Sequence, residues 1–315
     1  MDRLDAMEVF VAAVDEGSLA AAGRRLGRSP AAVTRAVALL ERRTGTRLLN
    51  RTTRTLRLTA AGERYAATCR RLIADLAEAE LAAGSERQAP RGLLTLTAPS
   101  FFGALHVRPL TDAFLDAYPE VQVRLLLLDR VINLIDEGMD LAVRIGQLPD
   151  SNLIAVGVGA LRRVVCASPD YLARRPAPAT PSDLAQHDCI AFTQESPVET
   201  SWSFAAGPER GATRPTQARH VRVRPRFITN SAEAAVAAAS AGHGITRVLS
   251  YQVERELAAG RLVLLLPEFE PPPPPVHLVY PEARLALAKA RAFVDFAVPR
   301  LRAELARIAS VADNA

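Results

Sequence analysis

The 315-residue sequence lacks the features that mark secreted, membrane or metal-binding proteins. Its three cysteines are far apart and odd in number, which argues against a disulfide framework or a zinc site. No run of eighteen apolar residues occurs, so no membrane span is expected. The first ten residues, MDRLDAMEVF, lack the basic start and apolar core of a signal peptide. We therefore expect a cytoplasmic protein in a reducing environment.

Catalytic motifs are also missing. The sequence contains no GxSxG, no HExxH, no P-loop and no GxGxxG after a strand, and Gly242-His243-Gly244 is too short to indicate a site. The five histidines are scattered without metal-ligand spacing. They are His106, His187, His220, His243 and His277. We therefore expect no enzyme, no metal and no cofactor.

Basic charge is concentrated in one segment. Between Ser18 and Arg71 there are thirteen arginines against two acids, Glu41 and Glu63, which is a net charge of +11. The whole chain carries +5, so the remaining residues sum to −6. A basic island on an otherwise acidic protein indicates a module that binds a polyanion, although a solvated basic helical hairpin would have the same charge.

The residue pattern in this island favours DNA as the polyanion. Ser18 is a natural N-cap for a short helix that ends at Gly27, and Ser29 caps a second helix with Pro30 at its first position. The second helix has an apolar face of Val33, Val37 and Leu40, and an opposite face of Ala31, Thr34, Arg35 and Ala38. Two basic alternating strands with a turn near 51–54 follow. The segment therefore predicts a winged helix-turn-helix.

Two further helices flank this segment. Residues 2–16 have apolar residues at helical spacing and should pack beneath the helix-turn-helix. A longer helix is expected from the Thr59 cap to about Gly84, with six residues spaced by 4, 3, 4, 3 and 4, as in a coiled-coil seam. These are Tyr65, Cys69, Leu72, Leu76, Ala79 and Ala83. The same stripe could instead pack on its own domain, and Cys69 is expected to be a small core residue rather than a redox switch.

The sequence changes in character beyond a polar hinge at 84–92. Strands are expected at 93–97, 121–127 and 140–145, a helix at 102–118, and a short helix marked by Val131, Leu134 and Ile135. A second series of strands and helices occupies 162–266; the pentaproline 271–275, a strand at 276–280 and a helix at 288–309 complete the chain. This alternation predicts mostly parallel sheets with helices on both faces, and the pentaproline should be an extended surface connector.

These segments resemble one known family over essentially the whole chain. The block MEVFVAAVDEGSLAAAGRRLGRSPAAVTRAVALLERRTGTRLLNRTTRTLRLTAAGERY resembles the DNA-binding head of LysR-type transcriptional regulators. The stretches TAPSFFGALHVRPL, EGMDLAVRIGQLPDSNL, VVCASPDYLARRP, HDCIAF, AAVAAASAGHGIT and RAFVDFAVPRL resemble the family's effector domain. The resemblance implies an all-α winged helix-turn-helix head with a long linker helix, followed by an α/β two-lobed domain of the type 2 periplasmic-binding-protein fold.

The expected domains follow from this organisation. They are a DNA-binding domain at 1–60, a linker and dimerisation helix at 61–88, and an effector-binding domain at 89–315. Lobe I of the last comprises 91–162 and 267–310, and lobe II comprises 163–266. The resemblance further implies a homodimer or tetramer, a double-stranded DNA operator, a small-molecule effector and RNA polymerase as partners, and no membrane. A solute-binding or enzymatic α/β protein is the alternative, but neither would carry a basic winged head.

The exposed face of the second helix of the helix-turn-helix should enter the major groove. Arg35 can bond guanine bidentately, and Ala31 or the Thr34 methyl group can contact a thymine methyl. The family often has Gln in place of Pro30 and Ser in place of Thr34, so the base preference of this chain is its own. The wing and the helix N-termini should contact phosphate. The predicted DNA-binding residues are Ser18, Ser29, Pro30, Ala31, Thr34, Arg35, Arg51, Thr52 and Arg54.

The effector is expected between the two lobes, at the carboxyl ends of strands. Ser100 ends the first strand and precedes a helix, so its hydroxyl and nearby N–H groups suit a carboxylate, although it could equally be a plain N-cap. The resemblance implies that this serine binds effector. An acid at Asp129 would instead favour a neutral or amine-bearing ligand. The predicted effector-binding residues are Ser100, Phe101, Phe102, Asp129, Arg144, Gly146, Phe192, Thr193, Asn230 and Thr246.

Overall fold

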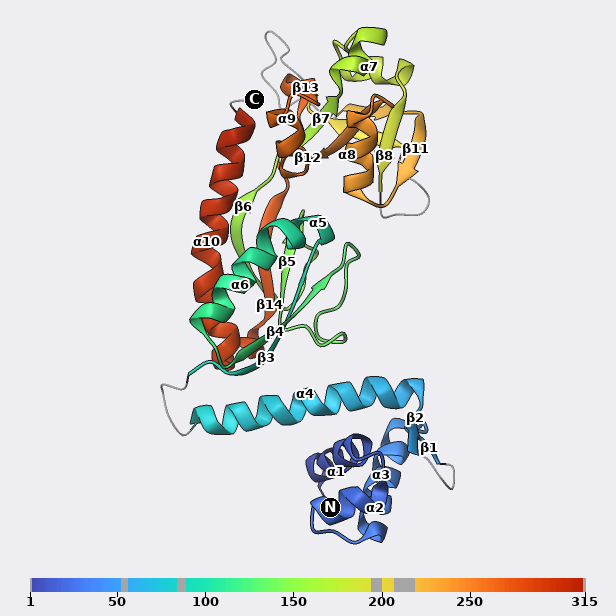
Figure 1. The fold of residues 1–315 in the computed structure, drawn as a ribbon, viewed down its shortest axis with the longest axis vertical. Coiled ribbons are helices and arrows are strands. Elements are labelled where there is room, and N and C mark those ends of the chain that lie inside the picture. The colour runs from blue at the N-terminus through green and yellow to red at the C-terminus, as the bar shows by residue number, and fades with distance from the viewer. Residues whose placement is uncertain (1, 52–55, 84–88, 194–199, 207–218, 314–315) are drawn as a thin grey trace. The chain divides into compact units, whose positions relative to one another are not determined.

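The computed structural model describes residues 2–51, 56–83, 89–193, 200–206 and 219–313 (Figure 1). The chain forms two compact units, Met1–Gly92 with Ala286–Ala288, and Leu93–Leu285 with Lys289–Ala315. We call them the N-terminal and C-terminal units. Among the described residues no helix is both long and apolar enough to span a bilayer.

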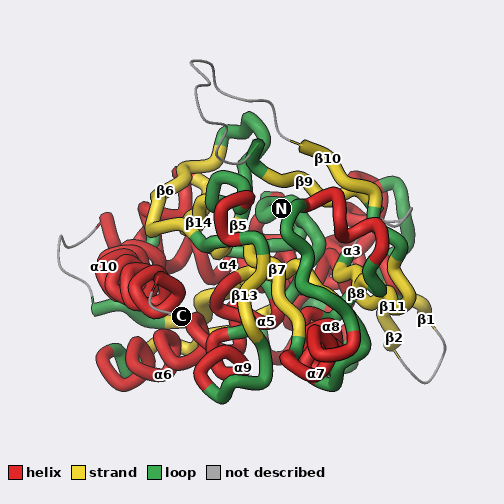
Figure 2. Tube along the Cα trace, turned by 90° about the horizontal axis from the view of Figure 1, so that it is seen from above, coloured by secondary structure: helices red, strands yellow, loops and turns green. Residues whose placement is uncertain are grey.

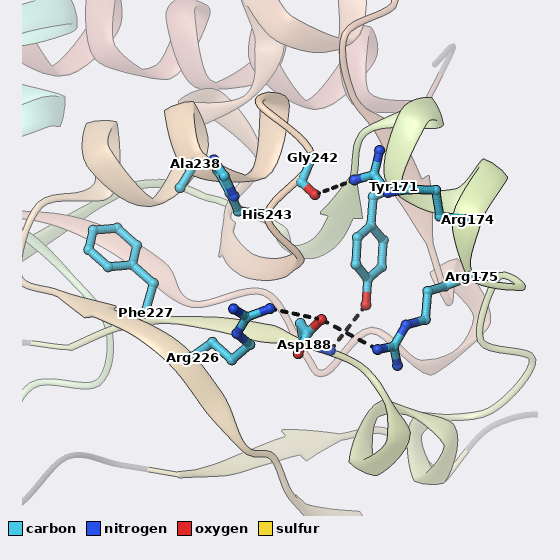
Figure 3. A pocket seen from close by; sticks show the side chains of 9 residues that line it. All are labelled: Tyr171, Arg174, Arg175, Asp188, Arg226, Phe227, Ala238, Gly242 and His243. Carbon is cyan, nitrogen blue, oxygen red and sulfur yellow. Dashed lines mark hydrogen bonds and ion pairs between the residues drawn. The ribbon is translucent and has the colours of Figure 1, made fainter.

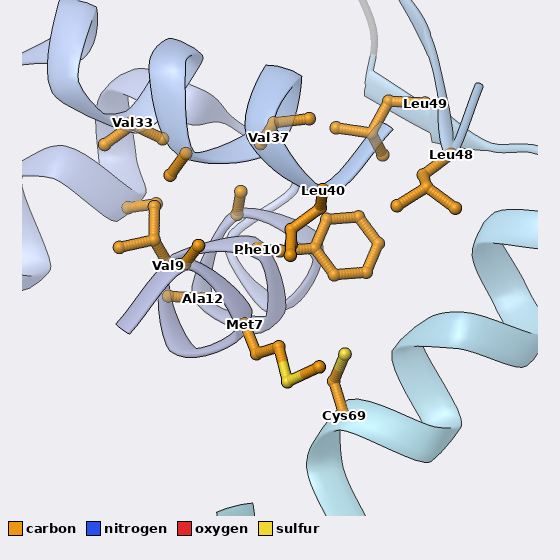
Figure 4. Close-up of a cluster of buried hydrophobic side chains, with 14 of the residues drawn as sticks. Met7, Val9, Phe10, Ala12, Val33, Val37, Leu40, Leu48, Leu49 and Cys69 are labelled. Carbon is orange, nitrogen blue, oxygen red and sulfur yellow. The ribbon is translucent and has the colours of Figure 1, made fainter. Parts of the chain in front are cut away.

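The N-terminal unit is a small helical domain with a two-stranded wing. Its elements are α1 (Arg3–Asp15), α2 (Leu19–Arg25), α3 (Pro30–Thr44), β1 (Leu49–Arg51), β2 (Leu56–Leu58) and α4 (Ala60–Ala83). Phe10 of α1, Leu40 of α3 and Cys69 of α4 are fully buried in one core (Figure 4). The expected helices and wing are therefore present, and one core holds them together.

Lobe I of the C-terminal unit is a five-stranded sheet in the order β4-β3-β5-β14-β6. The strands are β3 (Gly92–Ala98), β4 (Val121–Leu127), β5 (Leu141–Ile145), β6 (Leu153–Ala160) and β14 (Pro275–Pro281). Its helices are α5 (Ser100–Phe102), which continues through a π-turn (Gly103–Val107) into α6 (Arg108–Ala117), and α10 (Ala288–Asp313). Phe114 of α6 packs edge-on against Phe293 of α10 at 5.0 Å between ring centroids, so the last helix does return to lobe I.

The helix α10 also lies against β6 (Figures 1 and 2). The guanidinium of Arg302 donates to the carbonyl of Gly157 at 3.1 Å. A Cβ at Gly159 would lie 2.8 Å from Leu305, so the absence of a side chain there permits the close packing.

Lobe II is a second five-stranded sheet, in the order β11-β8-β12-β7-β13. The strands are β7 (Arg163–Ala167), β8 (Cys189–Phe192), β11 (Pro225–Thr229), β12 (Ile245–Leu249) and β13 (Val263–Leu265). A separate two-stranded antiparallel sheet pairs β9 (Ser201–Phe204) with β10 (Arg219–Arg222). The helices are α7 (Pro169–Arg174), α8 (Ala232–Ser240) and α9 (Glu254–Ala258). Short 3-10 turns lie at Pro181–Gln186, Ser250–Gln252, Pro267–Phe269 and Glu282–Ala286.

Two chain crossings join the lobes. One is Leu161-Arg162 between β6 and β7, and the other includes the pentaproline, whose last residue, Pro275, begins β14. Arg162 in the first crossing forms a bidentate ion pair with Glu270 at the start of the second, with both nitrogen–oxygen distances 2.8 Å. The pair ties the two crossings together.

Each of the expected mostly parallel sheets contains one reversed strand. In lobe I, β3 pairs parallel with β5, but β14 runs antiparallel to both β5 and β6. In lobe II, β8 runs parallel to β11 and β12, whereas β7 runs antiparallel to β12 and β13. Strands β7 and β14 enter their sheets from the other lobe rather than through a local helical crossover, which explains their reversed direction.

Two local features also differ from what the sequence predicts. Strand β6 was not expected. The helix expected around Val131 is absent, because residues 134–138 form turns. Val131 and Ile135 are 83% and 61% exposed, so their helical spacing does not reflect a buried face.

Candidate DNA-binding and effector-binding sites

The helix-turn-helix is set by its caps. The Ser18 hydroxyl accepts a hydrogen bond from the N–H of Ala21 at 3.3 Å, and the Ser29 hydroxyl accepts one from Ala32 at 3.2 Å. Both predicted N-caps are confirmed, and Pro30 begins α3 as expected. The hydroxyls are therefore engaged with their own helices, which fixes where α2 and α3 begin.

The two faces of α3 are those expected from the sequence. Val33, Val37 and Leu40 are fully buried, together with Ala36, which the sequence pattern missed. Pro30, Ala31 and Arg35 are exposed and Thr34 is half-buried. The N-terminal half of α3 thus presents a small, polar and basic surface above a packed core.

An ion pair that sequence reasoning missed holds the turn between α2 and α3. Arg28 binds Asp5 of α1 through both guanidinium nitrogens, one at 2.8 Å. This hydrogen bonding lowers the pKa of the Asp5 carboxyl. A Cβ at Gly23 would lie 2.7 Å from the Arg28 carbonyl, so glycine is needed for the close approach. Arg28 belongs to the basic island, but its guanidinium binds Asp5 of α1 and helps to orient α3.

The wing is anchored to α3 by one of the two acids of the island. The Glu41 carboxylate accepts from the N–H groups of Leu48 and Leu49 at 2.9 and 3.2 Å. Strands β1 and β2 pair antiparallel with Leu49 opposite Leu58. Of the predicted wing contacts, Thr52, Arg54 and the side chain of Arg51 lie outside the described residues.

The predicted seam on α4 divides into two parts. Cys69 is fully buried against α1, and the Tyr65 ring lies 5.9 Å from that of Phe10, so both pack within their own domain. Leu72 and Leu76 are 41% and 37% exposed. The side chains of the last two seam residues, Ala79 and Ala83, lie outside the described residues. The expectation that Cys69 is a core residue is confirmed.

In lobe I, the predicted carboxylate site at Ser100 is occupied by the protein itself. The Ser100 N–H donates to Asp129 Oδ1 at 2.9 Å. The residue capping this helix is Pro99, which offers no side-chain hydrogen bond. Asp129 is exposed. Its carboxylate therefore accepts the Ser100 N–H at the surface, in the position that the sequence predicts for the carboxylate of an effector.

An aromatic cluster joins the two lobes beside this pair. The rings of Phe101 and Phe102 lie 5.8 and 5.3 Å from Tyr251 of lobe II. Burial raises the pKa of Tyr251, and the charge of Asp129 acts in the same direction. Sequence reasoning missed Tyr251, because it does not directly end a regular strand. Phe101 is half-buried, but Phe102 is fully buried in the core, so the structure does not support a ligand contact for Phe102.

Arg144 lies in β5 of the lobe I sheet, and one of its own guanidinium nitrogens has no hydrogen-bond partner among the described residues. It is half-buried, and its Nη2 is buried without a hydrogen-bond partner in the described part of the chain. Burial lowers the pKa of Arg144, and the charge of Arg130 lowers it further. The neighbouring Gly146 has φ +118°, and its N–H donates to Pro275.

The lobe II candidates are partly structural. Thr246 is fully buried, and its hydroxyl donates to the carbonyl of Ile190 at 3.2 Å, so a ligand contact there is not supported. The Thr193 N–H donates to the carbonyl of Thr229 at 3.1 Å. Phe192 is half-buried in the lobe II core, and Asn230 is exposed. Within the described ranges no cluster of His, Cys, Asp or Glu could hold a metal ion.

A basic winged helix-turn-helix followed by a two-lobed α/β domain defines a class of ligand-responsive DNA-binding protein. Residues 4–63 match the family model "Bacterial regulatory helix-turn-helix protein, lysR family", and residues 87–302 match "LysR substrate binding domain". The chain belongs to the LysR family and is a DNA-binding transcriptional regulator with a C-terminal effector-binding domain.

Named relatives cover nearly all of the chain. It is 36% identical over 296 residues to an HTH-type transcriptional regulator of Xanthomonas campestris, covering 93% of this chain and 84% of that one. It is 35% identical over 307 residues to the HTH-type transcriptional regulator PtxR of Pseudomonas aeruginosa, covering 98% and 96%. The solved structure of CrgA, a LysR-type transcriptional regulator from Neisseria meningitidis, is 31% identical, with a TM-score of 0.59 and coverage of 94% and 98%.

Proposed function

We propose that this regulator reads an operator with the N-terminal half of α3 in the major groove. The supporting observation is the exposed surface of Ala31 and Arg35 above the buried stripe of Val33, Val37 and Leu40. Arg35 would bond guanine, with Ala31 and the Thr34 methyl near thymine. The wing and the N-termini of α2 and α3 would contact phosphates.

Two arginine variants test this division of labour. Arg35→Ala should relax the preference at one operator position and cost about 1–3 kcal/mol there. Arg54→Ala in the wing should weaken binding to all sequences alike and lower the salt slope by about one. The measurement is a titration against the DNA flanking the gene at two salt concentrations, with random DNA as competitor. Equal losses on every sequence for both variants would contradict the proposal.

The dimer is proposed to form through the exposed part of the α4 seam. Leu72 and Leu76 are large apolar side chains left uncovered by their own domain. The double variant Leu72→Asp, Leu76→Asp should sediment as a monomer at micromolar concentration, because charges would enter the seam. Ala67→Asp, at an exposed position on the same helix, should remain a dimer. A dimer that persists in the double variant would place the interface elsewhere.

The effector is proposed to bind between the lobes at Ser100, Phe101, Asp129 and Asn230. Because Asp129 already occupies the Ser100 N–H, an amine-bearing or neutral effector fits better than a carboxylate. A thermal-shift screen of small amines and carboxylates should show stabilisation by amines. Asp129→Asn should abolish it, and Asp136→Asn, at an exposed position further along the chain, should not. Stabilisation by carboxylates alone would contradict this assignment.

We further propose that effector binding closes the lobes and changes how two heads engage their half-sites. We also propose a cytoplasmic location, contact with RNA polymerase, a tetramer built from two dimers, and no catalytic activity. Membership of a family of transcriptional regulators supports these proposals. Solution scattering with and without a confirmed effector should show a changed envelope. An unchanged envelope alongside changed transcription would exclude the rigid-body version.

A further inference from the structure

Lobe II contains a pocket that none of the predicted functions uses. Its volume is about 650 Å³, within the usual range for small-molecule sites (Figure 3). Arg174 and Arg175 enter it from the end of α7, Arg226 and Phe227 from β11, and His243 from the turn after α8.

The pocket lies at the opposite end of the lobe II strands from the proposed effector site. Asp188 lines it immediately before β8, whereas Thr193 follows β8 at the other end. Five residues of extended chain span roughly 16 Å. Helix α8 likewise begins beside Asn230 and ends at the pocket. The two sites are therefore separate, but β8 and α8 connect them.

The glycines of the Gly242-His243-Gly244 motif shape this pocket. A Cβ at Gly244 would lie 2.3 Å from the Asp188 carbonyl, and one at Gly242 would lie 3.0 Å from Arg174 Nη2. Without a side chain at Gly242, Arg174 donates to its carbonyl at 2.8 Å. The motif, which the sequence did not explain, thus brings α7, α8 and the start of β8 together around the pocket.

The charged groups of the pocket are only partly compensated. Asp188 lies 3.6 Å from both Arg175 and Arg226, beyond the length of a good hydrogen bond (Figure 3). Arg175 also donates to the Gln186 carbonyl at 2.9 Å, and the Arg226 side chain is 74% exposed. Three arginines and one aspartate leave a charge of +2 when His243 is counted as neutral. Each guanidinium has five N–H donors, so several stay available.

We propose that this pocket binds a phosphomonoester that carries a flat apolar group. A phosphomonoester carries close to two negative charges at neutral pH, which matches the net charge of the pocket. Arg175 and Arg226 supply planar donors for its oxygens. Phe227, 41% exposed, and Ala238 supply an apolar wall for the remainder of the ligand.

Phenyl phosphate is the probe, and isothermal titration of the full chain is the measurement. We expect saturable binding of phenyl phosphate, weaker binding of inorganic phosphate and none of phenol. Arg226→Ala should weaken phenyl phosphate binding by about tenfold or more, because the phosphate loses a charged hydrogen-bond donor. The Arg226 side chain is exposed, so its removal should not disturb the fold. Phe227→Ala should reduce phenyl phosphate to the affinity of inorganic phosphate.

The matched control is Arg224→Ala, an exposed arginine two residues away that does not line the pocket. Its affinity for phenyl phosphate should equal that of the unchanged protein. An equal loss in Arg224→Ala, or no loss in Arg226→Ala, would overturn the proposal, since the anion would then bind basic surface such as the head. No saturable binding at about 10 mM would also overturn it, and would leave the pocket to an acidic macromolecule.

Discussion

The two units of this chain build their functional surfaces in different ways. In the N-terminal unit the residues proposed to contact DNA all lie between Ser18 and Arg54 in the sequence, and those that the structure describes belong to consecutive elements over a single core. In the C-terminal unit the proposed effector residues extend from Ser100 to Asn230, and Tyr251 of lobe II completes the cluster. The first surface depends on local helix signals, and the second depends on how two sheets exchange strands.

The same contrast appears in what holds each unit together. A helical core fixes α3, with Arg28 binding Asp5, 23 positions away, and Glu41 binding Leu48, 7 positions away. Lobe I, by contrast, receives β14 from residues more than a hundred positions after its other strands. Contacts between distant segments, such as Arg162 with Glu270, therefore matter more to the C-terminal unit.

The largest expected effect separates the stabilities of the two units. Phe10→Ala should destabilise the N-terminal unit by about 3–5 kcal/mol, because Phe10 is fully buried at the centre of its core. Trp202 is the single tryptophan and lies in lobe II, so its fluorescence reports on the C-terminal unit alone. Circular dichroism reports on the helices of both units. In urea, the variant should lower the midpoint of the part of the circular dichroism transition that belongs to the N-terminal unit, and leave the midpoint of the Trp202 fluorescence transition unchanged. A shared shift would show that the units unfold together.

A smaller loss of stability is expected in the C-terminal unit, where the Trp202 fluorescence transition reports it. Arg162→Ala leaves Glu270, whose side chain is 14% exposed, without this partner. We expect a loss of about 1–3 kcal/mol from the Trp202 transition. The control is Arg108→Ala, since the Arg108–Asp112 pair is 61% and 56% exposed and should contribute less than about 0.5 kcal/mol. Equal losses of unfolding free energy in the two variants would mean that the Arg162–Glu270 pair stabilises the C-terminal unit no more than an exposed surface pair does.

The pH dependence of stability should be concentrated in the C-terminal unit. Burial lowers the pKa of His106 and of His187 below the ordinary value of 6.5. Folding therefore favours their neutral forms, so this stability is complete above pH 6.5 and is lost as the pH falls below it. The Trp202 midpoint in urea should decrease between pH 7.5 and pH 5.5. His106→Gln should flatten that decrease, and an unchanged slope would exclude His106 as a source.

The smallest expected effect is the reactivity of the three cysteine thiols, which should be low in both units. Burial raises the pKa of Cys69 to about 11 and the pKa of Cys166 and Cys189 to about 12, so all three are thiols at neutral pH. None should react with dithionitrobenzoate in the native protein, and three should react in denaturant. Rapid labelling of one native cysteine would show that its unit opens locally.

Much of the fold was predictable because its signals are local. The caps at Ser18 and Ser29 mark where α2 and α3 begin. Strand β6 was missed because its burial does not alternate cleanly, and the apolar spacing of Val131 and Ile135 suggested a helix where both are exposed. Local pattern cannot show which apolar residues find a partner.

The candidate sites divide in the same way. The exposed face of α3 follows from helical periodicity, so Ala31, Thr34 and Arg35 could be named from the sequence. Strand ends also indicated Ser100 and Asp129, but not that one binds the other. Phe102 and Thr246 were named for the same reason and are buried, because a position at a strand end does not fix the direction of a side chain.

By itself the sequence determined the family, the two-part organisation, the basic island and the caps that place α3, because these depend on composition and on residues a few positions apart. Only the tertiary structure decided that both sheets are mixed, that Cys69 faces its own core, that Asp129 occupies the Ser100 N–H, and that Arg174, Arg175 and Arg226 share a pocket. Each of these depends on residues far apart in the chain. Their contacts are set by the packing of whole elements, which no local pattern encodes.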